Sequence, residues 1–566
     1  MKRYPETLAA QQKANWEKQF TFSSRLRKVP DDEYEGRQPG TSNINNKGLA
    51  PFRGEFTEAH LKHLLRRVTF GVKEEDLQNL RGRSLNEVLD VLFTEEPEPA
   101  PPLNVSPDDD AVPIGQTWVD APFDVEKETP RILSLVSWWM GLAVEQRPTL
   151  REQMTLFWHN HFVTEANVVF DSRFMYRYLK LLRGNALGNF RDLTEKITID
   201  GAMLIYLNGT QNEASAPNEN YARELFELFT IGKGQQVGGG NYTTYTEEDV
   251  LAASRVLTGW VADRRTIQTY FIPERHDTGD KTFSAAFGGE TISNQGESEY
   301  KALIDMILRK RETAEFICRQ LYRWFVYYVI EDQVEENVIR PMAQILYDSD
   351  YEIEPVLRAL FASEHFHDMT AQGCLIRNPM DYTVGLFRQY DIVFPPESDP
   401  VNQYHMWGLI YFFNELLEMR LGNPPGVAGW PAYYQAPLYH ELWINSVTLP
   451  FRRDLATFFI FGGYENEGFQ LAADPFRLVE RVVSDPKDVN AFINDLVAYF
   501  FPIPIGEEQR EFLKETLRPG IPDNAWRFEW DTYLQNQDDP EVVRAMLIRI
   551  ANLLYTMMGF AEFHLS

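Results

Sequence analysis

The sequence predicts a mainly α-helical protein: one large helical globular domain with one small β-hairpin insertion and long ordered loops. Apolar residues recur at helical spacing in many segments along the 566 residues. Hydrophobic residues make up 44% of the chain and aromatic residues 13%, which supplies a substantial core and excludes global disorder. Strand-like alternation is convincing only near 266–291.

The chain is strongly acidic, since 55 basic and 83 acidic residues give a net charge of −28. Nucleic-acid binding needs a basic surface, so this charge argues against a nucleic-acid-binding protein and equally against an anionic membrane surface. The two cysteines, Cys318 and Cys374, define neither a disulfide framework nor a zinc motif.

No export or membrane segment is recognisable in the sequence. The first 20 residues lack the apolar centre of a signal peptide, and no run approaches 18 apolar residues. As it stands, the sequence therefore predicts a soluble cytoplasmic protein, although a trimmed N-terminus would remove this evidence.

In chain order, residues 1–56 are predicted to form an N-terminal arm, because 21–54 is rich in Arg, Lys, Pro, Gly and Asn. A single domain is predicted over 57–566, beginning with a helix that Thr57 caps. The acidic, proline-rich segment 94–130 is expected to be a long loop. Residues 150–163 are apolar all around a helix, which is typical of a buried one.

The segment 218–232 predicts a core helix with an unusual polar edge, started by Pro217 and Asn218 and ended by Gly232. Its apolar stripe contains Tyr221, Leu225, Leu228 and Phe229, and its polar stripe contains Asn220, Glu224 and Glu227. A carboxylate beside a buried face must be hydrogen-bonded, paired with a cation or bound to metal.

The remaining elements follow from capping and turn signals. A capping box at Thr246 opens a helix, and then Thr266–Ile272, a turn at 276–279 and a strand near Lys281–Phe287 predict the hairpin. The Pro- and Gly-rich stretch 423–431 is expected to be a loop, and a last helix is expected from Pro540 onward.

Several motifs together resemble the bacterial domain of unknown function 1800 family. They are His63–Gly71, Phe157–Phe162, Asn218–Gly232, Tyr245–Val250 with Leu257–Trp260, His276–Lys281, and Pro424–Trp430 followed by Trp443–Ser446. The resemblance spans roughly 57 to 564 and implies no assigned reaction. It implies that relatives are often exported, so a periplasmic location is an alternative. It also implies a neighbour-encoded phosphatase- or sulfatase-like protein, of the domain of unknown function 1501 family, as a partner. Relatives often carry His where this chain has Phe229.

The leading hypothesis for the chemistry is a metal site of His and carboxylate ligands. Its candidate ligands are His159, His161, Glu224, Glu227 and His276. This ligand set suits zinc, iron or manganese inside a helical bundle. Glu224 and Glu227 can reach one ion from a single helix face. His159 and His161, two residues apart, cannot do so unless the helix ends near Asn160.

Each candidate also has a structural explanation. The two histidines would each donate a ring N–H to a main-chain carbonyl and pack among Trp158 and Phe162. Glu227 would pair with Arg223, which Glu219 also reaches along the helix.

The expected hairpin turn supplies the other catalytic candidates. His276, expected to be exposed on a loop, is the acid–base candidate. Asp277 either joins the metal site or bonds its own main chain, and Lys281 either neutralises an anionic substrate or is solvated.

Other enzyme classes lack their motifs: the sequence has no nucleophile elbow, phosphate loop or dinucleotide fingerprint in strand–turn–helix context. Aromatic residues that could line a sugar-binding cleft are Trp260, Trp430, Tyr433, Tyr434 and Trp443, although such residues usually form core.

The sequence therefore favours a metal-dependent enzyme, most plausibly a hydrolase, with Glu224 and His276 as its principal residues. The alternatives are a non-catalytic helical scaffold for the phosphatase- or sulfatase-like partner and a carbohydrate-active protein.

Overall fold

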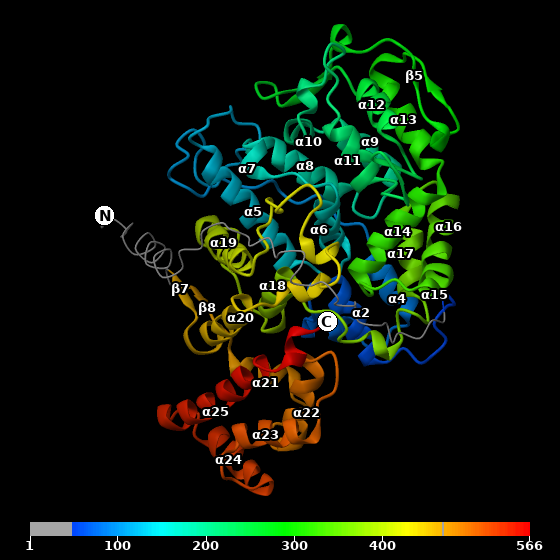
Figure 1. Cartoon of the computed structure of the whole chain (residues 1–566). Helices are drawn as coiled ribbons and strands as arrows, with labels where there is room; N and C mark the ends of the chain where they lie inside the picture. Colours follow the sequence, from blue (N-terminus) through cyan, green and yellow to red (C-terminus); the bar gives the residue numbers. More distant parts are fainter. Residues whose placement is uncertain (1–47, 467–468) are drawn as a thin grey trace. The chain divides into compact units, whose positions relative to one another are not determined.

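The computed structural model describes residues 48–466 and 469–566 (Figure 1). The described part is mainly α-helical, as predicted, and its strands form small two-stranded sheets. The arm predicted over 1–56 falls mostly outside the described residues. None of the described helices combines the length and apolar character that a membrane crossing requires.

The chain begins with three short helices, α2 (Glu58–Val68), α3 (Glu74–Leu80) and α4 (Leu85–Leu92). Residues 94–127 then run without a helix, and Leu103 and Thr117 form an isolated bridge within them. The next helices are α5 (Glu128–Glu145), α6 (Arg151–His161), α7 (Ala166–Val169), α8 (Ser172–Gly184), α9 (Phe190–Thr198) and α10 (Gly201–Tyr206). The helix predicted to be apolar all around is α6, whose Met154, Leu156, Phe157 and Trp158 are at most 2% exposed.

The middle of the chain holds α11 (Asn220–Glu224), the π-helix η3 (Leu225–Phe229) and α12 (Glu247–Val256). After the strands come α13 (Glu299–Leu308), α14 (Arg311–Phe325), α15 (Asp332–Val334), α16 (Arg340–Asp348), α17 (Ile353–Phe361), α18 (Pro379–Gln389) and α19 (Pro400–Leu416).

The last part contains the 3-10 turns η9 (Pro431–Tyr433) and η10 (Tyr439–Trp443), followed by α20 (Thr448–Thr457). Then α21 (Pro475–Val482), α22 (Val489–Phe500), α23 (Glu507–Leu517), α24 (Asp523–Gln535) and α25 (Pro540–Met558) pack on one another, orange to red in Figure 1. Further short turns are η2 (Gly209–Gln211), η4 (Pro273–Arg275), η5 (Ala285–Phe287), η6 (Gly296–Ser298), η7 (Glu335–Ile339), η8 (Met369–Ala371), η11 (Phe458–Gly462) and η12 (Ala561–His564).

The strands of the described residues form four antiparallel pairs. They are β1 (Gln236–Gly238) with β2 (Asn241–Tyr242), β3 (Trp260–Asp263) with β4 (Gln268–Phe271), β5 (Lys281–Thr282) with β6 (Thr291–Ile292), and β7 (Tyr464–Asn466) with β8 (Phe469–Leu471). The predicted pairing of 266–272 with 281–287 is wrong, because β4 folds back on β3 and β5 pairs forward with β6. Gly259, with φ +99°, makes the turn into β3 just after α12, and the turn at 264–267 then brings β4 beside β3.

The predicted apolar stripe of 218–232 is observed. Tyr221, Leu225 and Phe229 are buried and Leu228 is partly buried. The helix widens into a π-helix at Leu225, which alters the spacing along its polar edge.

Close helix packing also depends on Gly141. Helices α5 and α19 pack along each other, and a Cβ on Gly141 would lie 2.5 Å from the ring of Trp407. The absent side chain therefore allows the indole to reach the α5 backbone.

Candidate functional site: an arginine-lined pocket

His159 is a structural residue in this fold. Its Nδ1–H donates to the Tyr178 hydroxyl oxygen over 3.0 Å, and its Nε2 accepts from the Gly422 N–H over 3.2 Å. Burial lowers the pKa of His159 to about 3, so the ring is neutral. Both nitrogens are therefore occupied, and no lone pair is left for a metal.

His161 points elsewhere, because α6 remains helical to this residue. Its Nε2 donates to the Phe229 carbonyl over 2.8 Å, and burial lowers its pKa to about 4. This is the carbonyl bond that the structural explanation of the sequence predicts.

The carboxylates of the polar edge have separate surroundings. Burial, reinforced by the charge of Glu227, raises the pKa of Glu224 to about 7. Glu227 pairs with Lys233 and accepts from the Tyr245 hydroxyl over 3.3 Å. The predicted Glu227–Arg223 pair is wrong, because the π-turn moves residue 227 off the line above Arg223.

The other polar residues of this segment are also structural. Both Nη atoms of Arg223 donate hydrogen bonds to the Glu247 carboxylate, at 2.8 and 2.7 Å, and Nη2 also donates to Glu219 over 3.0 Å. The Asn218 side chain accepts from the N–H of Asn220 over 2.9 Å at the start of α11.

His276 is buried rather than exposed as predicted. Its Nδ1 lies 2.9 Å from the Thr258 carbonyl, and its Nε2 lies 3.0 Å from Glu299 Oε2. Lys281 is fully buried, pairs with the same Glu299 and donates to the Asp277 carbonyl. Asp277 itself is held by Arg255 at 2.6 and 3.1 Å. His276, Lys281 and Glu299 therefore form a buried polar cluster at the start of β5, and the partly exposed Arg255–Asp277 pair adjoins it.

The tryptophans singled out by the sequence are divided between core and cavity wall. Trp158 is fully buried and donates to the Ala186 carbonyl over 3.0 Å, and Trp430 is 1% exposed. Trp260 is half-buried and lines a small cavity with Tyr221, Asn212 and Asn218. Among the described residues, no group of three or more His, Cys, Asp or Glu side chains could hold a metal ion.

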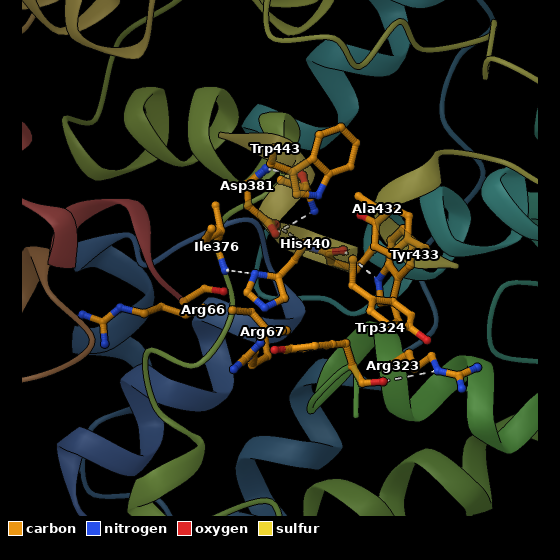
Figure 2. Close-up of a pocket in the computed structure, with 16 residues that line it drawn as sticks. Arg66, Arg67, Arg323, Trp324, Ile376, Asp381, Ala432, Tyr433, His440 and Trp443 are labelled. Carbon is orange, nitrogen blue, oxygen red and sulfur yellow. Dashed lines mark hydrogen bonds between the residues drawn. The ribbon is translucent and has the colours of Figure 1, made fainter. Parts of the chain in front are cut away.

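A different pocket brings together polar groups from distant parts of the chain (Figure 2). The empty space between its lining residues is about 540 Å³, a figure that includes open solvent at its mouth. It lies among α2, α6, α14, the start of α18 and the turns η9 and η10. Its polar lining includes Arg66, Arg67, Arg323, Gln153, Asn378, Asp381 and His440.

Arg66 and Arg67 are consecutive residues in the last turn of helix α2. The Arg66 Nη2 donates to the Tyr499 and Phe501 carbonyls, both at 3.0 Å, at the C-terminal end of α22. The Arg67 Nη2 donates to the Ala371 carbonyl over 3.0 Å. Nε of each is buried and finds no acceptor among the described residues. Both guanidinium groups are therefore only partly satisfied.

Arg323 also lines the pocket, and the charges of two further arginines, Arg377 and Arg452, act on its residue Asp381. Arg323 lies over the Tyr439 ring at 6.0 Å, and its Nε is 3.4 Å from the Tyr328 carbonyl. Behind the wall, Arg377 donates to the Leu565 carbonyl over 2.9 Å, and Arg452 donates to the Arg377 carbonyl over 2.8 Å. Nη1 of Arg377 and both Nε and Nη1 of Arg452 are buried without an acceptor in the described chain.

These five arginines share an unusual electrostatic situation. Their partners are main-chain carbonyls, a thiol and aromatic rings, and within the described ranges none forms an ion pair. Burial and mutual repulsion lower the pKa of Arg66 to about 9, and burial lowers that of Arg377 to about 10. Cations concentrated in this way, in a chain of net charge −28, favour an anion between them.

Asp381 has the acidic side chain among the residues that line the pocket. Its Oδ1 accepts from Gln153 Nε2 over 2.8 Å, and its Oδ2 accepts from Asn378 Nδ2 over 2.7 Å. Burial raises its pKa to about 6, against the lowering effect of Gln153, Arg377, Arg67 and Arg452. It is thus a carboxylate held in place by amides and not by an ion pair.

His440 completes the polar wall. Its Nδ1 accepts from the Ile376 N–H over 3.1 Å, as Figure 2 shows, and its Nε2 is buried without a partner among the described residues. Burial, aided by Arg67, lowers its pKa to about 4. The neutral ring therefore carries its proton on Nε2 and offers it as a donor.

An aromatic wall closes one side of the pocket. The rings of Trp324 and Tyr433 stack with centroids 4.2 Å apart, and Tyr433 also meets Trp443 edge-on at 6.0 Å. Tyr433 and Trp443 were candidates for a sugar cleft in the sequence, and the structure places them beside the arginines. This wall can hold the apolar or ring part of a ligand.

The sequence hypothesis missed this pocket. The available signal was arginine within apolar segments, as in Arg66 and Arg67 beside Leu65 and Val68. A charged side chain is almost never fully buried unless it is paired, so such an arginine indicates a nearby acceptor or anion. Ala371, which accepts from Arg67, lies 304 positions away, and Tyr499, which accepts from Arg66, lies 433 positions away, so no local pattern reveals these contacts.

Comparison with known proteins adds one finding. The family model described as Protein of unknown function (DUF1800) matches residues 63–565. No curated protein and no solved structure matches the chain. The matched range contains the arginines, Asp381 and His440 of the pocket, and it confirms the family that the sequence motifs resemble. This chain therefore belongs to the DUF1800 family of proteins of unknown function.

Proposed function

We propose that this protein binds a small ligand bearing an oxyanion, a phosphate, sulfate or carboxylate group, in the arginine-lined pocket. One observation carries the proposal. Arg66, Arg67 and His440 line one cavity, and each has a buried N–H group without an acceptor among the described residues. Leaving such donors unsatisfied costs about 1–3 kcal/mol each, and an oxyanion removes that cost.

The arrangement of donors and aromatic rings in the pocket suits a ligand that joins an oxyanion group to a larger apolar part. Guanidinium groups bind oxyanions through paired N–H donors, and the neutral His440 adds a directed donor without adding charge. Trp324 and Tyr433 supply a flat apolar surface for the remainder of the ligand. Because Arg66 and Arg377 also cover the negative C-terminal end of α22, we assign direct ligand contact to Arg67, Arg323 and His440.

The functions expected from the sequence stay predictions. A metal-dependent hydrolase requires stoichiometric metal in the purified protein and its loss in Glu224→Ala. A scaffold requires co-purification with a phosphatase- or sulfatase-like partner, and carbohydrate activity requires sugar binding. We favour the arginine pocket because His159 and His276 have each ring nitrogen engaged within the protein.

The test is isothermal titration calorimetry with phosphate, sulfate and acetate, at a constant ionic strength set with sodium chloride. We expect at least one of the three to bind with a Kd of roughly millimolar or tighter. Arg323→Gln should weaken that binding about tenfold, since one charge-assisted contact is lost.

The matched control is Arg147→Gln. Arg147 is 74% exposed and pairs with Glu96 at 3.0 Å, so its loss removes the same charge away from the pocket. Its binding should equal that of the wild type. Absence of binding by all three anions, or equal affinity in Arg323→Gln, would overturn the proposal.

A further inference from the structure

Asp381 gives the arginine pocket a feature that simple anion attraction does not explain. It places a carboxylate among guanidinium and imidazole donors, where a bound anion would meet a like charge (Figure 2). The amides of Gln153 and Asn378 hold both of its oxygens in place. Each oxygen keeps a second lone pair that can accept a hydrogen bond.

The groups around Asp381 come from several elements. Arg67 faces it from α2, Gln153 from α6, Arg377 and Asn378 from its own N-terminal side, and Arg452 from α20. Tyr433 and His440 line the same cavity. Asp381 forms an ion pair with none of these arginines in the described structure, so its free lone pairs remain available to a ligand.

We propose that the pocket selects a tetrahedral oxyanion that carries its own proton, inorganic phosphate, and rejects fully deprotonated sulfate. This selection rests on the anion binding proposed above, and it assigns to Asp381 the discrimination between phosphate and sulfate. Arg67, Arg323 and His440 donate to three oxygens, and Asp381 accepts the P–O–H of the fourth. Sulfate has no proton to offer and leaves two facing acceptors.

The chemistry of the two probes makes the difference clear. At about pH 7.5 inorganic phosphate still carries a proton on oxygen, whereas a phosphate monoester, which titrates near pH 6, has lost it. Sulfate has the same tetrahedral shape and a similar size but only acceptor oxygens. A pocket built of donors alone would bind both, so discrimination isolates the contribution of Asp381.

The experiment is calorimetry of phosphate and sulfate with the wild-type protein at about pH 7.5 and constant ionic strength, where Asp381 is ionised. We expect phosphate to bind at least about tenfold more tightly. In Asp381→Asn the amide donates to sulfate, and the two affinities should converge to within about threefold.

Asp381→Asn also loses one of its two amide contacts, so circular dichroism must show a native fold. A second measurement needs no variant. The sulfate affinity of the wild type should rise at least about fivefold between pH 7.5 and pH 5, because protonated Asp381 becomes a donor. His440, with a pKa of about 4, stays neutral over this range.

The outcomes separate the two proposals. Equal binding of phosphate and sulfate by the wild type, with no change in sulfate affinity at low pH, would overturn the selection and leave anion binding intact. Binding of acetate without binding of phosphate would also overturn the selection of phosphate and leave anion binding intact. Failure of all three anions to bind would overturn both.

Discussion

The main-chain N–H of Ile376 donates to Nδ1 of His440 over 3.1 Å, and this bond determines the tautomer of the ring. Because Nδ1 is an acceptor and burial keeps the ring neutral, the proton resides on Nε2, which is buried without a partner among the described residues. A single main-chain contact thus converts a histidine into a directed donor for an anion.

Two substitutions separate the roles of the two ring nitrogens. His440→Asn keeps an acceptor near the Nδ1 position and removes the Nε2 donor, whereas His440→Gln places an amide donor near Nε2. We expect His440→Asn to weaken binding of the anion about tenfold, or about 1.4 kcal/mol, and His440→Gln to weaken it less. Calorimetry with phosphate measures both. The reverse order of affinities would contradict the assigned tautomer.

Glu224→Gln should change how stability depends on pH. The folded-state pKa of about 7 lies above the ordinary value of 4.5, so the folded protein holds this proton more tightly. The stability contributed by the protonated group is complete below about pH 4.5 and is lost as pH rises through 7. Glu224→Gln escapes that loss. We expect equal stability near pH 4 and a gain of about 1 kcal/mol near pH 8, a modest value because the carboxyl is partly solvated.

Urea unfolding at both pH values tests this expectation, with Glu274→Gln, at an exposed position, as the control for loss of one negative charge. A variant less stable than the wild type at pH 8 would show that the Glu224 carboxylate has a stabilising partner.

Lys281→Met should strongly destabilise the fold. Lys281 is fully buried and pairs with Glu299, which His276 also contacts at 3.0 Å. Removing the lysine leaves Glu299 with less compensation, for which we expect a loss of about 3 kcal/mol in the free energy of unfolding. Lys301→Met, at a lysine 54% exposed and 3.4 Å from Glu195, should cost less than about 1 kcal/mol. Equal losses in both variants would show that the buried cluster is not an anchor.

Gly141→Ala should destabilise the packing of α5 on α19. The new Cβ would lie 2.5 Å from the Trp407 ring, so the helix or the indole must shift, at a cost of about 1–3 kcal/mol. Gly184→Ala, where no atom lies within 4 Å of the new Cβ, should be neutral or slightly stabilising. Thermal unfolding of the two variants makes the comparison. A stable Gly141→Ala variant would mean that this helix interface is loosely packed.

Local sequence patterns predicted much of the fold. The apolar stripe through Tyr221 and Phe229 and the all-round apolar α6 are observed, because helical periodicity directly reports which faces are buried. The hairpin prediction failed where alternation was short. Thr266–Ile272 has the pattern of a strand, but alternation does not identify the strand with which it pairs. In the structure β4 pairs with the preceding β3 and not with the following β5.

The sequence by itself determined the helical class, the family and the buried faces of individual helices, since these depend on residue spacing along one segment. Only the tertiary structure decided which polar groups meet. It occupied His159 with Tyr178 and Gly422, it joined His276 and Lys281 through Glu299, and it brought Arg67, Asp381 and His440 around one cavity. The packing of the helices determines which polar groups, separated by hundreds of residues, come into contact. The pattern of charges along the chain does not specify that packing.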